Sequence, residues 1–121
     1  IRLSLVGSEM CIRDSITGGG VTENLPRSIS KNTKAVIDLN KWKLPAIFKW
    51  ISSFNVSQNE MLRTFNCGYG MVIIIDEKNL SRVRKVIKKY KFKSDIIGNV
   101  DIKKSTKEKS IKFIGRLNFN D

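Results

Sequence analysis

The chain has 121 residues, 40% of them hydrophobic, which is enough for one compact domain, and we expect no second one. It contains no histidine, so the usual general base near neutral pH, the commonest zinc ligand and the middle residue of a Ser/His/Asp triad are missing. The 23 Lys and Arg residues outnumber the 11 Asp and Glu residues, and the charge of +12 attracts phosphates, nucleic acid or an anionic membrane without choosing among them.

Cysteine usage and hydropathy indicate neither an exported nor a membrane protein. Cys11 and Cys67 form no CxxC pair and have no other candidate ligands beside them, so neither a disulfide framework nor a zinc site is indicated. The longest apolar run, residues 71–75, is far shorter than the ~20 residues of a membrane helix. We therefore expect a cytoplasmic protein with no membrane partner and no metal ligands in this chain.

Residues 1–15 differ in character from the rest of the chain. The apolar stretch over residues 3–7 suits a truncated signal peptide, but no proper small-residue cleavage site follows it. The run over residues 4–14 is also similar to a translated library-adapter sequence that contaminates some assembled reads. We therefore expect residues 1–15 to be a non-native leader that contributes nothing to the fold, and residues 16–121 to form the domain.

From Ile16 onward, strands and helices alternate. A strand end runs into residues 17–20, where three glycines allow a tight turn and close approach to a ligand. Two signals mark helix starts: Pro45 in a first turn, and Ser57 with Glu60 in a capping-box pattern. The expected elements are a short helical turn over residues 23–29, a strand over 35–38, a helix over 45–54 closed by Asn55, a helix over 57–64, and a buried strand over 71–75.

The last third of the chain contains one amphipathic helix and two further strands. Over residues 80–90, apolar side chains recur at helical spacing and basic side chains occupy the other faces, which predicts a surface helix on a sheet. A strand is expected through Ile96, Ile97 and Val100, then a solvated loop over residues 103–110, then a last strand through Ile111, Phe113 and Leu117 that completes a hairpin. The predicted fold is α/β, of the α+β type, with helices packed on one mixed β-sheet.

A glycine loop that opens onto a short helix is the first candidate site. It reads Ile16-Thr17-Gly18-Gly19-Gly20-Val21-Thr22-Glu23-Asn24-Leu25-Pro26-Arg27. Backbone N–H groups of such a loop can hold a phosphate or an oxyanion, and Arg27 can add a charge-assisted contact. The loop lacks the Lys of a Walker A motif and the spacing of a dinucleotide fingerprint, so a tight turn without a ligand explains these residues equally well.

The second candidate site lies between a predicted helix and a buried strand. It reads Thr64-Phe65-Asn66-Cys67-Gly68-Tyr69-Gly70-Met71, and loops in this position often line a site. Asn66 can hydrogen-bond a ligand or stitch its own turn, and the residues do not decide between these roles. Cys67 has no histidine to activate it, so we expect a small packed thiol rather than a nucleophile.

Four segments, taken in order, resemble the C-terminal domain of the phosphoribosylformylglycinamidine cyclo-ligase (aminoimidazole ribonucleotide synthetase) family. They are Ile-Thr-Gly-Gly-Gly-x-x-Glu-Asn-x-Pro-Arg from Ile16, Ala-Val-Ile-Asp from Ala35, Ile-Phe-Lys-Trp from Ile47, and Glu-Met-x-Arg-Thr-Phe-Asn-Cys-Gly-x-Gly-Met from Glu60. The resemblance runs to about residue 100. The family usually has a histidine before the first segment, where this chain has Ser15.

The resemblance implies the fold of the aminoimidazole ribonucleotide synthetase-like superfamily and an ATP-dependent ligase of purine synthesis. In that reaction ATP phosphorylates the amide oxygen of formylglycinamidine ribonucleotide, and an internal nitrogen then closes the imidazole ring. It implies a substrate and nucleotide site, with no catalytic residue assigned, that contains Thr17, Gly18, Gly19, Gly20, Asn24, Arg27, Asn66, Gly68 and Gly70. The nucleotide site, the Mg²⁺ site and the dimer contact would lie mostly in an N-terminal domain that this chain lacks. We therefore expect an incomplete C-terminal domain of a homodimeric enzyme, inactive on its own.

Two other functions suit parts of the sequence. The Lys-rich helix and the loop over residues 103–109 suit a small basic nucleic-acid-binding module, although zinc-finger and RNA-recognition signatures are missing. The glycine segments also suit another ATP-dependent enzyme of the same superfamily. We expect no sequence-specific nucleic-acid partner, because scattered lysines bind nucleic acid by counterion release.

Overall fold

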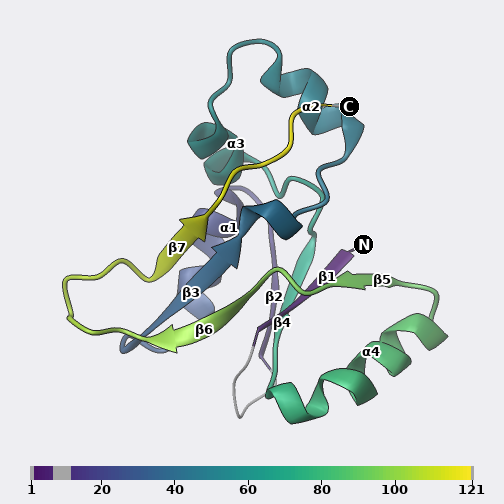
Figure 1. Ribbon diagram of the computed structural model, residues 1–121, viewed down its shortest axis with the longest axis vertical. Helices are drawn as coiled ribbons and strands as arrows, with labels where there is room; N and C mark the ends of the chain where they lie inside the picture. Colours follow the sequence, from purple (N-terminus) through teal and green to yellow (C-terminus); the bar gives the residue numbers. More distant parts are fainter. Residues whose placement is uncertain (1, 7–11, 121) are drawn as a thin grey trace.

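The computed structural model describes residues 2–6 and 12–120, and its strands form two sheets (Figure 1). One sheet, in the order β2-β4-β1-β5, contains β1 (Arg2–Val6), β2 (Ile12–Ser15), β4 (Met71–Ile74) and β5 (Lys93–Asp95). The other, in the order β6-β3-β7, contains β3 (Thr33–Asp38), β6 (Gly98–Ile102) and β7 (Ile111–Ile114). Each sheet contains parallel and antiparallel pairs, so the α/β class with mixed pairing is confirmed, although two sheets replace the single expected one.

Four α-helices surround these sheets. They are α1 (Gly20–Asn24), α2 (Ala46–Ser52), α3 (Gln58–Thr64) and α4 (Leu80–Lys89), with 3-10 helices at Leu25–Ser28, Leu39–Lys41 and Glu77–Asn79. Figure 1 shows α2 and α3 at one end of the molecule and α4 at the other, beside β5. In the described part of the chain, no helix has the length and apolar character needed to cross a membrane.

The first sheet contains the segment that was expected to lie outside the fold. β1 lies between β4 and β5, and β2 pairs with β4 so that Ser15 is opposite Met71. The expectation that residues 1–15 contribute nothing to the fold is therefore wrong for residues 2–6 and 12–15. The partner residues lie 56 to 91 positions away in the sequence, so no local pattern could indicate this pairing. Its non-native origin stays a prediction, and Cys11 lies outside the described residues.

The second sheet corrects two strand predictions. β6 and β7 do not form a hairpin, because both pair with β3, which lies between them. β3 takes the central place because Ala35 and Ile37 are fully buried, and a central strand is covered on both edges. The strand expected through Ile96, Ile97 and Val100 is divided: Ile96 and Ile97 lie between β5 and β6, where the chain passes from one sheet to the other.

Local signals at the helix ends are largely confirmed. The Ser57 side chain accepts a hydrogen bond from the Glu60 backbone N–H at 3.3 Å, as the capping pattern predicts. Pro45 is the N-cap of α2 rather than its first residue, and Asn55 has the left-handed φ of 66° that ends the helical segment. On α4 only Ile87 is buried, while Val86 and Tyr90 are 51% and 65% exposed, so the predicted apolar stripe is only partly packed.

One hydrophobic core connects the two sheets with α3. Its fully buried members include Ala35 and Ile37 of β3, Met61 and Leu62 of α3, and Val72 and Ile74 of β4. Burying side chains of this size stabilises a domain by about 1.5–3 kcal/mol each. The core therefore fixes α3 and β4, and with them the loop between them that contains the second motif.

Candidate functional site

The fold brings the two glycine motifs together. The Ile16 N–H donates to the Gly70 carbonyl at 2.9 Å, which joins the first residue of one motif to the end of the other. The Thr22 hydroxyl of α1 donates to the Leu62 carbonyl of α3 at 3.1 Å. Residues 40 to 54 positions apart in the sequence thus form one continuous loop surface between β2, α1, α3 and β4.

Gly20 anchors this surface because no other residue fits its position. Its φ of 61° lies in the left-handed region, and a Cβ placed on it would lie 2.0 Å from the Leu62 carbonyl oxygen and 2.7 Å from that of Phe65. Both neighbours are backbone atoms, so a flexible side chain cannot move aside to relieve the clash. Gly19 also has a left-handed φ, of 94°, but a Cβ there would mainly meet the side chain of Glu23. Gly20 therefore sets how closely α1 packs on α3.

Gly18 differs from its two neighbours because nothing in the described chain requires it to be glycine. It is exposed, its φ lies outside the left-handed region, and a Cβ placed on it would meet no atom within 4 Å. Among the described residues, no acceptor receives the backbone N–H of Gly18 or of Gly19. Two adjacent N–H groups of this loop thus have no acceptor in the described part of the chain, and adjacent free donors of this kind can bind oxyanions.

Asn24 holds the glycine loop from inside. Its side chain is only 2% exposed, and its Nδ2 donates to the carbonyls of Thr17, Gly18 and Gly20 at 3.3, 3.2 and 2.7 Å. Its Oδ1 accepts from the Arg27 guanidinium and, at 3.5 Å, from the Thr17 hydroxyl. Both ends of the amide are engaged within the loop, so Asn24 positions the loop instead of facing a ligand.

Replacing Asn24 with alanine is expected to lower the free energy of unfolding by about 2 kcal/mol, because buried carbonyls lose their donor. The measurement is a urea titration monitored by circular dichroism. Glu23→Ala is the matched control, since Glu23 is the exposed neighbour on the same helix, and it should change stability by less than about 0.5 kcal/mol. Equal stability of the two variants would contradict the role of Asn24.

Arg27 and Thr17 lie at the solvent side of the same loop. Both are exposed, and Arg27 is directed by its hydrogen bond to Asn24 Oδ1. Its guanidinium has five N–H donors, of which this contact uses only part. An anion bound by the N–H groups of Gly18 and Gly19 would therefore have the Arg27 guanidinium, which Asn24 holds in place, on the same loop.

In the second motif, Asn66, Gly68 and Gly70 each make a contact that fixes the backbone beside the glycine loop. Asn66 Oδ1 accepts from the Gly68 N–H at 2.9 Å, so this oxygen stitches its own turn, one of the two roles left open by the sequence. Gly68 has a φ of 102°, and a Cβ on it would lie 2.6 Å from the Pro45 ring. Gly70 contributes the carbonyl that receives the Ile16 N–H. These contacts fix the turn of the second motif and join it to Ile16, and the role of the three residues at a ligand site stays a prediction.

Cys67 is a packed thiol. Its side chain is fully buried and its Sγ donates to the Met61 carbonyl at 3.4 Å. Burial raises the pKa of the Cys67 thiol to about 12, so the thiolate that a nucleophile requires does not form near neutral pH. The prediction of a small packed thiol agrees with this environment.

We expect Cys67 to resist iodoacetamide at pH 8 in the folded chain and to react rapidly after unfolding in urea. Because its pKa is raised from 9.0 to about 12 on folding, the stability it contributes is complete below pH 9 and is lost as the pH rises toward 12. Peptide mapping of the alkylated protein separates Cys67 from Cys11. Rapid labelling of Cys67 without urea would show that the thiol is accessible.

Sequence reasoning missed the residues that brace the second motif. The Trp42 indole N–H donates to the Cys67 carbonyl at 2.9 Å, and its ring meets that of Tyr69 edge-on at 4.6 Å. The Tyr69 hydroxyl in turn donates to Asp95 Oδ2 at 2.7 Å. Trp42 and Asp95 are at least 25 residues from their partners, so only an aromatic residue between two glycines, Tyr69, hinted at such packing.

Two grooves on the described chain lie away from the glycine loop. A groove of about 750 Å³ lies between α4 and β5, and one of about 420 Å³ lies beside β3 and β6. Neither is lined by a residue of the glycine loop or of the second motif. Neither groove is therefore part of the loop surface that the two motifs form.

The described residues lack a side-chain cluster that could hold a metal ion by itself. They contain no group of three or more carboxylate, thiol or imidazole side chains that could hold a metal ion. Magnesium requires oxygen ligands in an octahedral arrangement, and Glu23 is the one carboxylate of the glycine loop motif.

Comparisons with known proteins agree with the order of these motifs. The sequence model of the family described as "AIR synthase related protein, C-terminal domain" matches residues 11–109, so the match includes the end of the segment interpreted as a leader. The chain is 51% identical over 73 residues to a phosphoribosylformylglycinamidine cyclo-ligase of Neisseria gonorrhoeae, and 48% identical over 73 residues to one of Neisseria meningitidis. The matches cover 60% of this chain and 21% of each relative, so the chain spans about a fifth of the relatives' length.

Proposed function

The chain belongs to the AIR synthase related protein, C-terminal domain family, and on this basis we propose that it is part of an ATP-dependent cyclo-ligase. The proposed reaction converts formylglycinamidine ribonucleotide to aminoimidazole ribonucleotide in purine synthesis. The relatives' names support this reaction, and the open glycine loop is the structural observation that carries it. We place the full-length enzyme in the cytoplasm as a homodimer.

The glycine loop suits a reaction that moves a phosphoryl group. An amide carbon is a poor electrophile, and ATP would convert its oxygen into a phosphate that can leave when the ring closes. Such catalysis depends on positioning and on stabilising the charge of the phosphoryl group. The N–H groups of Gly18 and Gly19 are proposed to donate to a phosphate oxygen or to the developing oxyanion. Asn24 would keep these donors aligned, and Arg27 would add positive charge.

The remaining parts of the site are assigned to the rest of the protein. The described residues contain no cluster of three or more metal-binding side chains, so we place the magnesium ligands mostly on the rest of the protein. We also place most of the nucleotide site outside this chain, and neither of its two described grooves is lined by the glycine loop. The chain alone is therefore expected to be inactive.

The test is to recover the complete reading frame and to measure ADP release that depends on formylglycinamidine ribonucleotide. The full-length protein should release ADP only with this substrate, and the 121-residue chain should release none. ADP release that does not require the substrate, or that requires a different acceptor, would contradict the proposed function. Thermal melts run in parallel separate misfolding from lost chemistry.

A further inference from the structure

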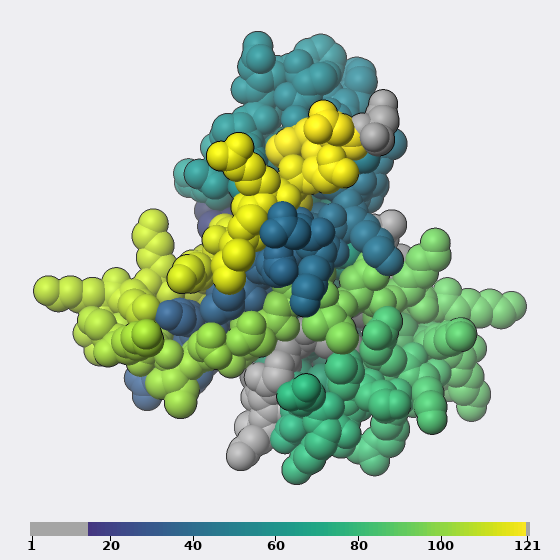
Figure 2. Space-filling model, in the orientation of Figure 1, coloured from purple at the N-terminus to yellow at the C-terminus, as the bar shows by residue number. Residues whose placement is uncertain are grey.

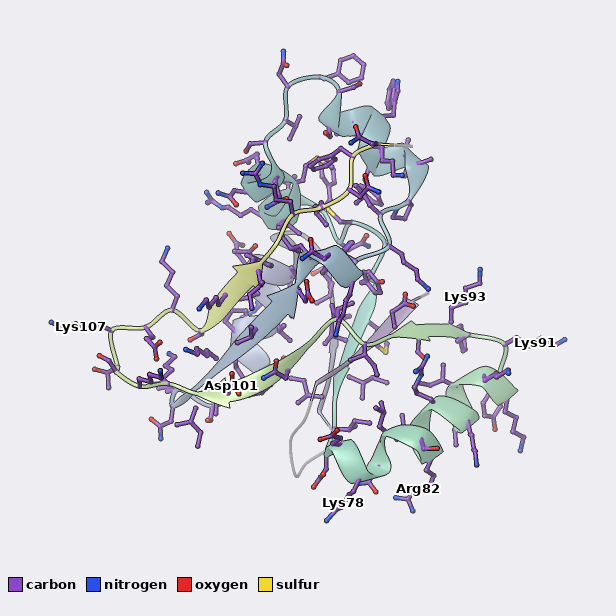
Figure 3. The ribbon with its side chains drawn as sticks, viewed as in Figure 1. Lys78, Arg82, Lys91, Lys93, Asp101 and Lys107 are labelled. Atoms are coloured by element: carbon purple, nitrogen blue, oxygen red, sulfur yellow. The ribbon has the colours of Figure 1, made fainter. Side chains whose placement is uncertain are left out.

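The groove between α4 and β5 combines a high positive charge with an apolar floor. Its volume is about 750 Å³, within the range of pockets that bind small molecules. Cationic side chains enter it from three parts of the chain: Lys43, the α4 residues Arg84, Lys85 and Lys88, and Lys93 of β5. Figure 3 shows α4 and β5 side by side, with Lys91 at the turn that joins them and Lys93 on the strand.

Four of these five cations, all except Lys43, have no acidic partner among the described residues. Among the described residues, no carboxylate lies within 4.0 Å of the charged groups of Arg84, Lys85, Lys88 or Lys93. The one carboxylate of the groove, Asp95, already binds Lys43 Nζ at 3.0 Å and the Tyr69 hydroxyl at 2.7 Å. Arg84 and Lys85 also lie four and three positions before Lys88 on one helix, where like charges at these spacings repel. A bound anion would relieve this repulsion.

Part of the groove is already organised for such a ligand. Arg84 Nε and Nη2 donate to the Ser94 hydroxyl and carbonyl, both at 3.3 Å, which fixes the guanidinium against β5. A fixed guanidinium loses less conformational entropy when it binds a phosphate than a mobile one does. Leu80 and the 45% exposed Phe92 supply apolar surface beside the cations.

We propose that the α4–β5 groove binds a small ligand that carries two or more phosphate groups attached to a flat ring, of the nucleotide class. The phosphates lie against Arg84, Lys85 and Lys88, and the ring lies on Phe92, because aromatic faces stack on planar rings. This site is separate from the glycine loop and does not depend on the proposed cyclo-ligase activity.

The distribution of charge favours a small ligand over a nucleic-acid strand. The other basic segment, the loop between β6 and β7 with Lys107, lies on the opposite side of the molecule from α4 (Figures 2 and 3). Within that loop the Glu108 carboxylate pairs with Lys34 at 2.8 Å, so its charge is partly balanced. A nucleic-acid strand would require a continuous row of basic residues, whereas the unpaired basic residues named above lie around one groove.

The experiment is calorimetric titration of the 121-residue chain with ADP and, separately, with inorganic triphosphate. Both should bind at one saturable site, with ADP the tighter, because only ADP has a ring for Phe92. The double variant Arg84→Ala/Lys88→Ala should weaken both probes by about tenfold or more. Phe92→Ser should weaken ADP alone. Lys107→Ala/Lys109→Ala, which removes the same charge far from the groove, should change neither.

Four results would overturn the proposal. The first is no saturable binding of either probe at about 1 mM, and the second is equal weakening of binding by Arg84→Ala/Lys88→Ala and by Lys107→Ala/Lys109→Ala. The third is loss of ADP binding in Gly18→Val while Arg84→Ala/Lys88→Ala still binds ADP. The fourth is far tighter binding of a single-stranded oligonucleotide than of ADP. The second would show diffuse charge attraction, the third would move the nucleotide to the glycine loop, and the fourth would identify a nucleic-acid surface.

Discussion

Replacing Gly20 with alanine is expected to lower the free energy of unfolding by about 3 kcal/mol, by combining the strain of a left-handed φ with overpacking. The added methyl group would lie 2.0 Å from the Leu62 carbonyl oxygen, and that carbonyl belongs to the backbone of α3. Either α1 must move away from α3 or α3 must distort, and both changes disturb the buried side chains of Met61 and Leu62. Denaturant unfolding, with the midpoint and slope measured together, gives the loss directly.

Gly18→Ala is the matched control, since it makes the same chemical change two residues earlier. A Cβ at Gly18 meets nothing within 4 Å, so this variant should be as stable as the parent within about 0.5 kcal/mol. If Gly20→Ala and Gly18→Ala unfold at the same denaturant concentration, the packing of α1 on α3 is not as described.

Local chemistry accounts for the elements that sequence reasoning located correctly. The cap at Ser57 and the left-handed residue at Asn55 each depend on residues a few positions apart, and such patterns can be recognised in a single sequence. The same holds for α4, where apolar residues recur at helical spacing, and for β4, where consecutive residues are apolar.

Pairing between distant segments could not be derived in this way. The position of β3 between β6 and β7, and of β1 between β4 and β5, depends on which strands bury most surface together. A hairpin is the simplest connection between two neighbouring strands, but the short-range pattern contains no information about a third strand that separates them.

In the candidate site, too, local sequence identified the motifs, whereas contacts between distant segments determine what each residue does. The glycine motifs were identified from their residues, but their separate roles depend on contacts across the fold. Gly20 and Gly18 are the same residue type and lie two positions apart, yet a Cβ on Gly20 would meet backbone carbonyls 42 and 45 residues away, whereas a Cβ on Gly18 would meet no atom within 4 Å. Asn24 was expected to line the cleft, and this stays a prediction. Its side chain lies inside the loop, where its three acceptors come together only when the loop is folded.

The most direct test of the central claim, that the glycine loop faces the reacting phosphoryl group, is the turnover of Gly18→Val in the full-length enzyme. A valine side chain fits the fold at this exposed position, so thermal stability should match that of the parent. It would block close approach to the N–H groups of Gly18 and Gly19, and losing such a donor reduces turnover by about 10²- to 10³-fold. Lys107→Ala, on the distant β6–β7 loop, should leave substrate-dependent ADP release unchanged. A folded Gly18→Val enzyme that turns over like the parent would contradict the account.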